Sequence, residues 1–285
     1  MSVPDLVEIP FEEPFSLEVT LKSGQLFHWE PMDLDGLPGY AGCIGSGPPT
    51  WIGQTEQGNV VTLSGHEEKA GRYFGLDQAI REIQATFPAN DPVLERAIAY
   101  CPGIRVARQP VWECLATFIT SSLKQVAHIR GISMTLRERF GTAYEFEGRT
   151  FYSYPEPAAL VAAGETALRD CALGYRAKSL ALAGAAIAEG RIDLGKVEAE
   201  MDMDVARESL LELHGVGEKI ANCALLFSCG HWGAFPIDVW IERILRSEYR
   251  KRLKGAKLQK WAVDYFGPNA GYAQQYLFHF ARKTL

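Results

Sequence analysis

Two side chains of this sequence combine residue type and position in a way that suits nucleophilic chemistry. Lys219 follows Gly217 by two positions and opens the apolar run "IANCALLF", and Asp238 directly precedes "VWIERIL". An amine is a nucleophile only in its neutral form, which burial and the positive end of a helix both favour. A carboxylate at the head of a helix can cap it and can also stabilise positive charge in a transition state. Both residues are therefore catalytic candidates, with a solvated surface lysine and a plain helix cap as the alternatives.

The residues before Lys219 form a glycine hairpin, His214-Gly215-Val216-Gly217. Two glycines one position apart permit positive φ and let another molecule approach the backbone closely. We expect helices over residues 205–211 and 219–228, because apolar residues recur at helical spacing there. Free N–H groups at the start of the second helix would attract an anion such as a phosphate diester. An ordinary tight turn between antiparallel helices fits the same residues.

The elements that must position these residues change character along the chain. Up to about residue 108, short runs such as "SLEVTL" and "GNVVTLSG" indicate strands between turns rich in Gly and Pro, and "DQAIREIQATF" indicates a helix. From about residue 109 the apolar spacing is helical and glycines close successive helices, as at Gly141. The sequence therefore predicts an α+β fold. An N-terminal antiparallel β-sheet domain with helices spans 1–108, and a two-part α-helical domain spans 109–285, with a helix-hairpin-helix motif at about 204–229.

Composition excludes several classes of protein. The 285 residues are 47% hydrophobic but contain no apolar run long enough for a membrane span, and the acidic N-terminus does not resemble a signal peptide. The six cysteines are scattered without a C-x-x-C pair, so we expect no zinc or iron–sulfur site and a reducing cytoplasm. The formal net charge is −6, yet residues 241–260 hold eight Lys/Arg and two Glu, a local balance of 8 − 2 = +6. Such a run can be a solvated face or part of a surface for a polyanion.

The hairpin, lysine and aspartate together resemble the signature of the helix-hairpin-helix DNA glycosylases. In this sequence the aspartate, Asp238, follows Lys219 by 238 − 219 = 19 positions. The resemblance is strongest to the 8-oxoguanine DNA glycosylases and extends over much of the chain. Four further segments carry it in the same order: "LKSGQLFHW" (21–29), "FITSSLKQVAHIRGISMTLRERFG" (118–141), "LGYRAKSL" (173–180) and "FGPNAGYAQQYLF" (266–278).

This resemblance implies a base-excision repair enzyme with two activities. Lys219 would attack the sugar C1′, expel an oxidised purine and form a Schiff base, from which β-elimination nicks the strand. Asp238 would act on the cationic sugar or orient the lysine. The target base must leave the helix stack to be reached. The partner is then double-stranded DNA that contains a damaged base, with no cofactor and no catalytic metal.

The resemblance also implies roles for individual residues in this sequence. Gly24 would accept the N7–H of 8-oxoguanine through its carbonyl, Gln274 would read the Watson–Crick edge, and Phe278 and Cys223 would sandwich the base. Tyr175 would fill the gap left in the stack, and Arg176 would reach the orphaned base. The hairpin His214, Gly215, Val216 and Gly217 would grip the DNA backbone.

The sequence departs from the family pattern at two places. Leu123-Lys124-Gln125 and His128 stand where the family has an asparagine run and an arginine, and Trp240 stands at a DNA-contacting position where the family often has histidine. The changes at Leu123 and His128 predict weaker selectivity for the base opposite the lesion, and the change at Trp240 affects part of the grip on the phosphates.

Two other functions fit parts of this pattern. One is a monofunctional glycosylase for alkylated purines that uses water and Asp238, and the other is a non-catalytic helix-hairpin-helix module that binds DNA. We expect a monomer without membrane association, cytoplasmic and associated with the nucleoid in a prokaryote, or nuclear in a eukaryote.

Overall fold

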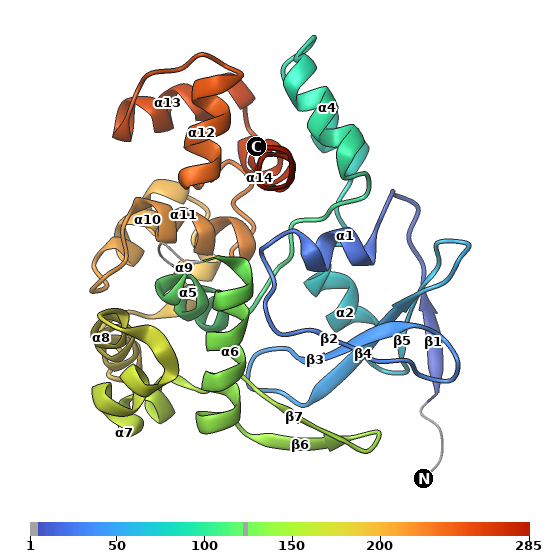
Figure 1. Ribbon diagram of the computed structural model, residues 1–285, viewed down its shortest axis with the longest axis vertical. Coiled ribbons are helices and arrows are strands. Elements are labelled where there is room, and N and C mark those ends of the chain that lie inside the picture. The colour runs from blue at the N-terminus through green and yellow to red at the C-terminus, as the bar shows by residue number, and fades with distance from the viewer. Residues whose placement is uncertain (1–4, 122–124) are drawn as a thin grey trace.

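The computed structural model describes residues 5–121 and 125–285 and has an α+β architecture. Its N-terminal part contains a five-stranded antiparallel sheet in the order β1-β5-β4-β3-β2. Figure 1 shows this sheet on one side of the molecule and most of the helices on the other. The strands are β1 (Leu6–Ile9), β2 (Glu30–Pro31), β3 (Gly39–Cys43), β4 (Pro49–Gln54) and β5 (Val60–Leu63). The predicted "GNVVTLSG" strand is β5.

Four helices accompany the sheet: α1 (Leu17–Lys22), α2 (Glu67–Tyr73), α3 (Ile80–Ala85) and α4 (Pro92–Tyr100). The strand prediction for "SLEVTL" is wrong, because this segment is α1. Ser16 caps the helix by accepting the N–H of Val19, and Leu17, Thr20 and Leu21 form its buried face. Six residues are too few to separate a period of two from a period of 3.6, so the local cap decides the conformation.

The remainder of the chain is mostly helical, and glycine ends several of its helices. Gly141 follows the helix that ends at Phe140, as predicted, and Gly174 and Gly190 have positive φ just beyond two further helix ends. Gly164 also has positive φ, but it lies at a kink inside a helix. The helices are α5 (Val111–Thr120), α6 (Val126–Phe140), α7 (Pro157–Leu168), the π-turn η1 (Arg169–Leu173), α8 (Arg176–Ala188), α9 (Leu194–Ala199), α10 (Met203–Leu211), α11 (Glu218–Phe227), α12 (Val239–Ser247), α13 (Gly255–Phe266) and α14 (Ala270–Thr284).

The antiparallel hairpin of β6 (Ala143–Phe146) and β7 (Arg149–Tyr152) was not predicted. Its two turn residues, Glu147 and Gly148, both have positive φ, as a tight two-residue hairpin requires. Phe151 packs into the same cluster as Trp51 and Ala41 of the N-terminal sheet. The hairpin therefore fastens the helical part to the sheet.

The helices enclose one large hydrophobic core that continues into α3 and α4 of the N-terminal part. At its centre, α11 is buried over most of its length and packs against α5, with the rings of Phe227 and Phe118 stacked 5.5 Å apart between their centroids. Because α10 and α11 are joined only by the hairpin, this packing fixes the start of α11 at the edge of the core. In the part of the chain described here, no helix is long and apolar enough to cross a membrane.

Candidate active site

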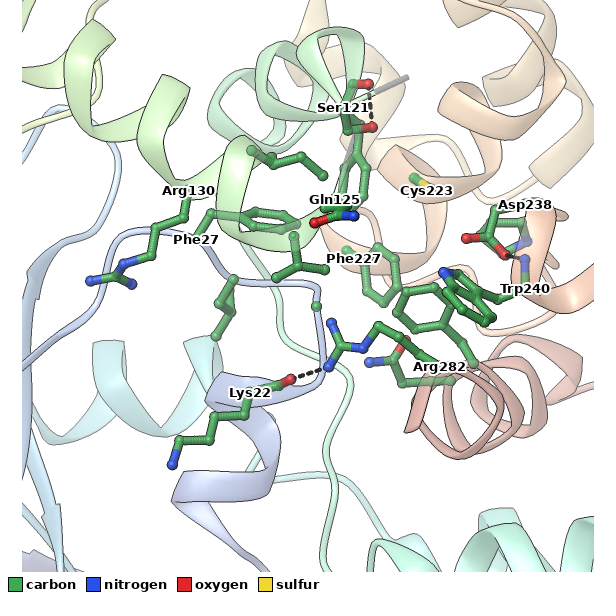
Figure 2. Close-up of a pocket in the computed structure, with 18 of the residues that line it drawn as sticks. Lys22, Phe27, Ser121, Gln125, Arg130, Cys223, Phe227, Asp238, Trp240 and Arg282 are labelled. Carbon is green, nitrogen blue, oxygen red and sulfur yellow. Dashed lines mark hydrogen bonds between the residues drawn. The ribbon is translucent and has the colours of Figure 1, made fainter. Parts of the chain in front are cut away.

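A cavity of about 1000 Å³ lies where the start of α11, the start of α12, the face of α14 and the turn after α1 converge. Eight of the residues singled out in the sequence line it: Gly24, Gln125, Lys219, Cys223, Asp238, Trp240, Gln274 and Phe278. These come from segments far apart in the chain, and Figure 2 shows the labelled side chains arranged around one space. The structure thus brings together both catalytic candidates and all four candidate base-pocket residues.

Lys219 lies half-buried in the first turn of α11. Its Nζ lies 3.2 Å from the Ser121 hydroxyl and 5.0 Å from the centroid of the Phe118 ring. Ser121 follows the last residue of α5, so the packing of α5 against α11 holds the amine in place. This lysine therefore lies in a sheltered, partly aromatic site and not on a solvated face.

Asp238 is the N-cap of α12, as predicted. Its Oδ1 accepts the N–H groups of Trp240 at 3.0 Å and Ile241 at 2.9 Å. Burial raises the pKa of this carboxyl, while the N–H of Ile241 and the Lys219 ammonium act in the opposite direction. The carboxylate and the amine thus interact across the cavity wall, so a role as helix cap and a role in catalysis are compatible.

Cys223 lies one helical turn after Lys219 and is buried. Burial raises the pKa of its thiol to about 11, with Lys219 lowering it and Asp238 raising it further. At neutral pH the side chain is therefore a neutral thiol, which presents a polarisable apolar surface to the cavity.

The face of α14 supplies a polar group and a ring to the same cavity. Gln274 is 4% exposed, and its Oε1 has no hydrogen-bond partner within the described part of the chain. Phe278 lies one turn further along the helix. A buried amide oxygen without a partner is costly, and a ligand that donates a hydrogen bond would satisfy it.

Gly24 faces Phe278 from the turn after α1. It has a φ of +88°, and a Cβ at this position would lie 2.9 Å from Cε1 of Phe278 and 2.8 Å from Nη1 of Arg282. Both the backbone conformation and the lack of room require glycine here. The turn and the α14 face therefore fit closely at one end of the cavity.

The hairpin before Lys219 presents free backbone. Gly215 has a φ of +84°, and an added Cβ would lie 2.4 Å from the Ser179 hydroxyl of α8. Gly217 is exposed, has open space around it and is the N-cap of α11 without a side-chain cap bond. The N–H groups in the first turn of α11 therefore face solvent and can bind an anion. His214 and Gly215 are exposed as well, whereas Val216 is buried and packs into the core.

The two residues of the predicted DNA wedge differ in exposure. Tyr175 is 64% exposed, as a side chain that fills a gap in DNA must be. Arg176 is only 7% exposed, and its guanidinium carbon lies 4.4 Å from the centroid of the Tyr175 ring. Arg176 must therefore swing out from beneath Tyr175 before it can reach an orphaned base.

Of the residues at the sequence departures, His128 is exposed on α6 and Gln125 precedes that helix and lines the cavity. Leu123 and Lys124 lie outside the described residues. Trp240 is half-buried in the cavity wall, with the Arg243 guanidinium carbon 4.6 Å from its ring centroid. Figure 2 shows Trp240 beside Asp238, so this residue contributes to the pocket itself as well as to its rim.

Sequence reasoning missed Ser121 and Arg282, both of which line the cavity. Arg282 follows Phe278 by four positions, and this spacing on α14 was the available signal for it. Ser121 gave no such signal, because its contact with Lys219 spans 98 positions. Within residues 5–121 and 125–285, no group of three or more His, Cys, Asp or Glu side chains is arranged to hold a metal ion.

The chain is similar to known proteins over most of its length. Residues 8–115 match the family model described as 8-oxoguanine DNA glycosylase, N-terminal domain. The chain is 33% identical to a probable N-glycosylase/DNA lyase of Methanothermobacter thermautotrophicus over 239 residues, which covers 76% of this chain and 75% of that protein.

Two solved structures have the same fold throughout. MBOgg1 in complex with a low-affinity DNA ligand has a TM-score of 0.89 and 30% identity, covering 99% of this chain and 96% of its own. The Clostridium acetobutylicum 8-oxoguanine glycosylase/lyase, in complex with duplex DNA containing cytosine opposite 8-oxoguanine, has a TM-score of 0.87 and 28% identity, covering 99% of both chains.

Proposed function

Because this chain belongs to the 8-oxoguanine DNA glycosylase family of the helix-hairpin-helix superfamily, we propose that Lys219 and Asp238 are its catalytic pair. The protein is a bifunctional DNA N-glycosylase and AP lyase that removes 8-oxoguanine from duplex DNA and nicks the strand. The observation that carries the residue assignment is the shared cavity, in which the Lys219 amine, the Asp238 carboxylate and an unpartnered Gln274 amide oxygen meet.

In the first step, the neutral Lys219 amine attacks C1′ of the damaged nucleotide. A bond forms between Nζ and C1′, the bond from C1′ to N9 breaks, and a proton shed by the nitrogen neutralises the departing base. Asp238 lies close enough to Lys219 for their charges to interact, so it can stabilise the positive charge that develops on the sugar. The Ser121 hydroxyl holds the amine in position.

Opening of the sugar ring then leaves an iminium between Nζ and C1′. The iminium makes the C2′ protons acidic. Loss of one such proton expels the 3′ phosphate by β-elimination, and the strand is nicked. O4′ takes up a proton as its bond to C1′ breaks, and the C2′ proton passes to water or to a basic group in the cavity as the 3′ phosphate leaves with its bonding electrons. Water then hydrolyses the imine and releases Lys219.

Recognition of the base is assigned to other residues that line the same cavity. The oxidised purine would lie between Phe278 and the neutral Cys223 thiol, with the Gln274 amide at its Watson–Crick edge. The Gly24 carbonyl would accept the N7–H that 8-oxoguanine has and guanine lacks. The close fit of Gly24 against Phe278 supports this role, because it holds the turn directly beside the ring.

The DNA itself would be held outside the cavity. The uncapped start of α11 at Gly217 offers N–H groups to a phosphate, and the exposed Tyr175 would fill the space of the extruded base. His128, exposed on α6, would lie near the opposite strand.

The test is to measure base release and strand nicking separately on a duplex with a single 8-oxoguanine. Lys219→Gln should lose both activities, while Lys69→Gln, at an exposed lysine on α2, should keep both. Loss of nicking with base release intact in Lys219→Gln would instead support a monofunctional enzyme that uses water.

A further inference from the structure

Arg282 lies on the same face of α14 as two proposed base-pocket residues, four positions after Phe278 and eight after Gln274. Its Nη2 donates a hydrogen bond to the Lys22 carbonyl at 2.5 Å and lies 3.4 Å from Nδ1 of His279. Its guanidinium carbon lies 5.5 Å from the centroid of the Phe278 ring. Figure 2 shows the Arg282 side chain reaching across the base of the pocket to Lys22.

The same guanidinium touches the other proposed reader of the base. Nη1 of Arg282 would lie 2.8 Å from a Cβ added to Gly24, so the guanidinium occupies the space directly beside this glycine. One side chain therefore bridges the α14 face that carries Gln274 and the turn that carries Gly24. Neither the catalytic steps nor the base contacts described above use it.

The hydrogen-bonding capacity of Arg282 is not used up by these contacts. A guanidinium has five N–H donors, and the hydrogen-bond partners of Arg282 among the described residues are one carbonyl oxygen and one ring nitrogen. Its Nε is buried and, within the described residues, has no hydrogen-bond partner. Buried donors of this kind cost free energy unless an acceptor reaches them. A cavity wall with unused donors is suited to a ligand that carries an acceptor.

The order of atoms around 8-oxoguanine identifies that acceptor. Along the rim of the base the polar atoms are N2, N1, O6, N7 and O8. The unpartnered Oε1 of Gln274 accepts hydrogen bonds, so it is placed at the two donors of the Watson–Crick edge, N1–H and N2–H. With the Gly24 carbonyl at N7–H, the atom between the two readers is O6, which only accepts hydrogen bonds. O8 lies beyond N7, towards the sugar. A donor that bridges Gln274 and Gly24 is therefore placed for O6.

We propose that Arg282 donates a hydrogen bond to O6 of the extruded base and makes the pocket selective for oxidised 6-oxopurines over 6-aminopurines. This inference rests on the proposed function and on the base orientation assigned there. Arginine has no acceptor atom, so a 6-amino group facing it would leave donors unpaired on both sides. Arg282 is thus a specificity-determining residue for the class of base that is excised.

A purely structural role predicts a different outcome. If Arg282 only fastened the Lys22–Gly24 turn, its loss would displace the Gly24 carbonyl and slow the excision of every 8-oxopurine to the same extent. The ratio of rates for two bases that differ at C6 therefore separates the two roles. The excision rate of 8-oxoguanine alone does not separate them, because both roles predict a slower rate.

The experiment compares single-turnover excision of 8-oxoguanine and of 8-oxo-2,6-diaminopurine in otherwise identical duplexes. These bases share N2, N7–H and O8 and differ at C6 and N1. Arg282→Met keeps the length of the side chain and removes all its donors. Arg81→Met, at an exposed arginine on α3, is the matched control.

We expect the wild type to prefer 8-oxoguanine, and Arg282→Met to narrow this preference by about tenfold to a hundredfold, the range for a hydrogen bond from a charged group. The Gln274 contribution stays in both enzymes, so the change in the ratio belongs to Arg282. Arg81→Met should leave the ratio unchanged. An unchanged ratio in Arg282→Met, or a wild type without preference, would overturn the inference.

Failure of the proposed function would look different, because the wild type would then excise neither base. If Arg282→Met is inactive on both bases, its binding of the two duplexes is measured in a Lys219→Gln background, with thermal unfolding as the check of folding. Equal loss of affinity for both bases would again overturn the inference, and a selective loss for 8-oxoguanine would support it.

Discussion

Replacing Asp238 by asparagine separates its role as a helix cap from its role in catalysis. Oδ1 of Asp238 accepts the N–H groups of Trp240 and Ile241, and an asparagine oxygen can accept the same two bonds. In Figure 2 the other carboxylate oxygen points towards the pocket. Asp238→Asn therefore keeps the cap and removes the negative charge that faces the sugar.

The expected effects on folding and on catalysis differ in size. Asparagine and aspartate are about equally good N-caps. Because burial holds the pKa of Asp238 above its ordinary value, its negative charge does not stabilise the folded state, so replacing it by a neutral amide should cost little or no free energy of unfolding. Removing one preorganised electrostatic group from a transition state costs about 2.7–4 kcal/mol, or a factor of about 10²–10³ in rate. We therefore expect a folded Asp238→Asn protein whose excision rate is lower by at least about a hundredfold.

The assay is single-turnover excision of 8-oxoguanine, with the affinity for the same duplex and the thermal unfolding curve measured in parallel. Asp238→Ala serves as the comparison, because it removes the cap as well and should cost a further ~0.5–2 kcal/mol of stability. If Asp238→Asn stays within about tenfold of the wild-type rate while folded, its carboxylate is only a helix cap and the catalytic assignment is wrong.

Three further predictions concern pH, salt and the opposite base. Burial holds the pKa of Asp238 above its ordinary value of 3.8, so the excision rate should fall as pH decreases through that raised pKa. A pH profile of the excision rate whose acid limb lies at or below 3.8 would contradict this prediction. A raised pKa means that the folded state binds this proton more tightly than the unfolded state. The Asp238 carboxyl therefore lowers the free energy of unfolding as pH rises from 3.8 through the raised pKa, and Asp238→Asn should abolish this contribution. DNA binding should weaken steeply as the salt concentration rises, despite the net charge of −6. Neutralising Arg250, Lys251 and Arg252 should reduce the slope of log affinity against log salt concentration. An unchanged slope would show that these side chains are only solvated and do not contact DNA. The preference for cytosine opposite the lesion should be weaker, by about five- to a hundredfold, than an arginine at position 128 would give. His128→Arg should therefore strengthen this preference when the excision rate is measured opposite C, A, G and T. Strong cytosine selectivity in the wild type that this substitution leaves unchanged would refute the inference.

The parts of the site that sequence predicted are those whose signal is local. Lys219 and Asp238 stand beside a glycine hairpin and a helix start, and the spacing of Gln274 and Phe278 places them on one face of α14. Segments that resemble a family then assign roles to such positions. The glycine helix stops and the α+β architecture were predictable for the same reason, since turn chemistry and apolar period are properties of short segments.

The contacts that complete the site could not be predicted in this way. Ser121 meets Lys219 across 98 positions and Arg282 meets Lys22 across 260, and no local pattern encodes contacts of that separation. The burial of Arg176 against Tyr175 is also a result of tertiary packing. The charge of an arginine side chain would by itself predict an exposed position. The β6–β7 hairpin was missed although it had a signal, the Glu147-Gly148 turn between two alternating runs.

The central claim is that Lys219 is the nucleophile that forms the Schiff base. The most direct measurement is borohydride reduction during turnover on an 8-oxoguanine duplex, followed by digestion and mass spectrometry of the protein–DNA adduct. We predict a covalent adduct on Lys219 in the wild type and in Lys69→Gln, and none in Lys219→Gln. Base release without any adduct in the wild type, or an adduct mapped to a different amine, would contradict the mechanism.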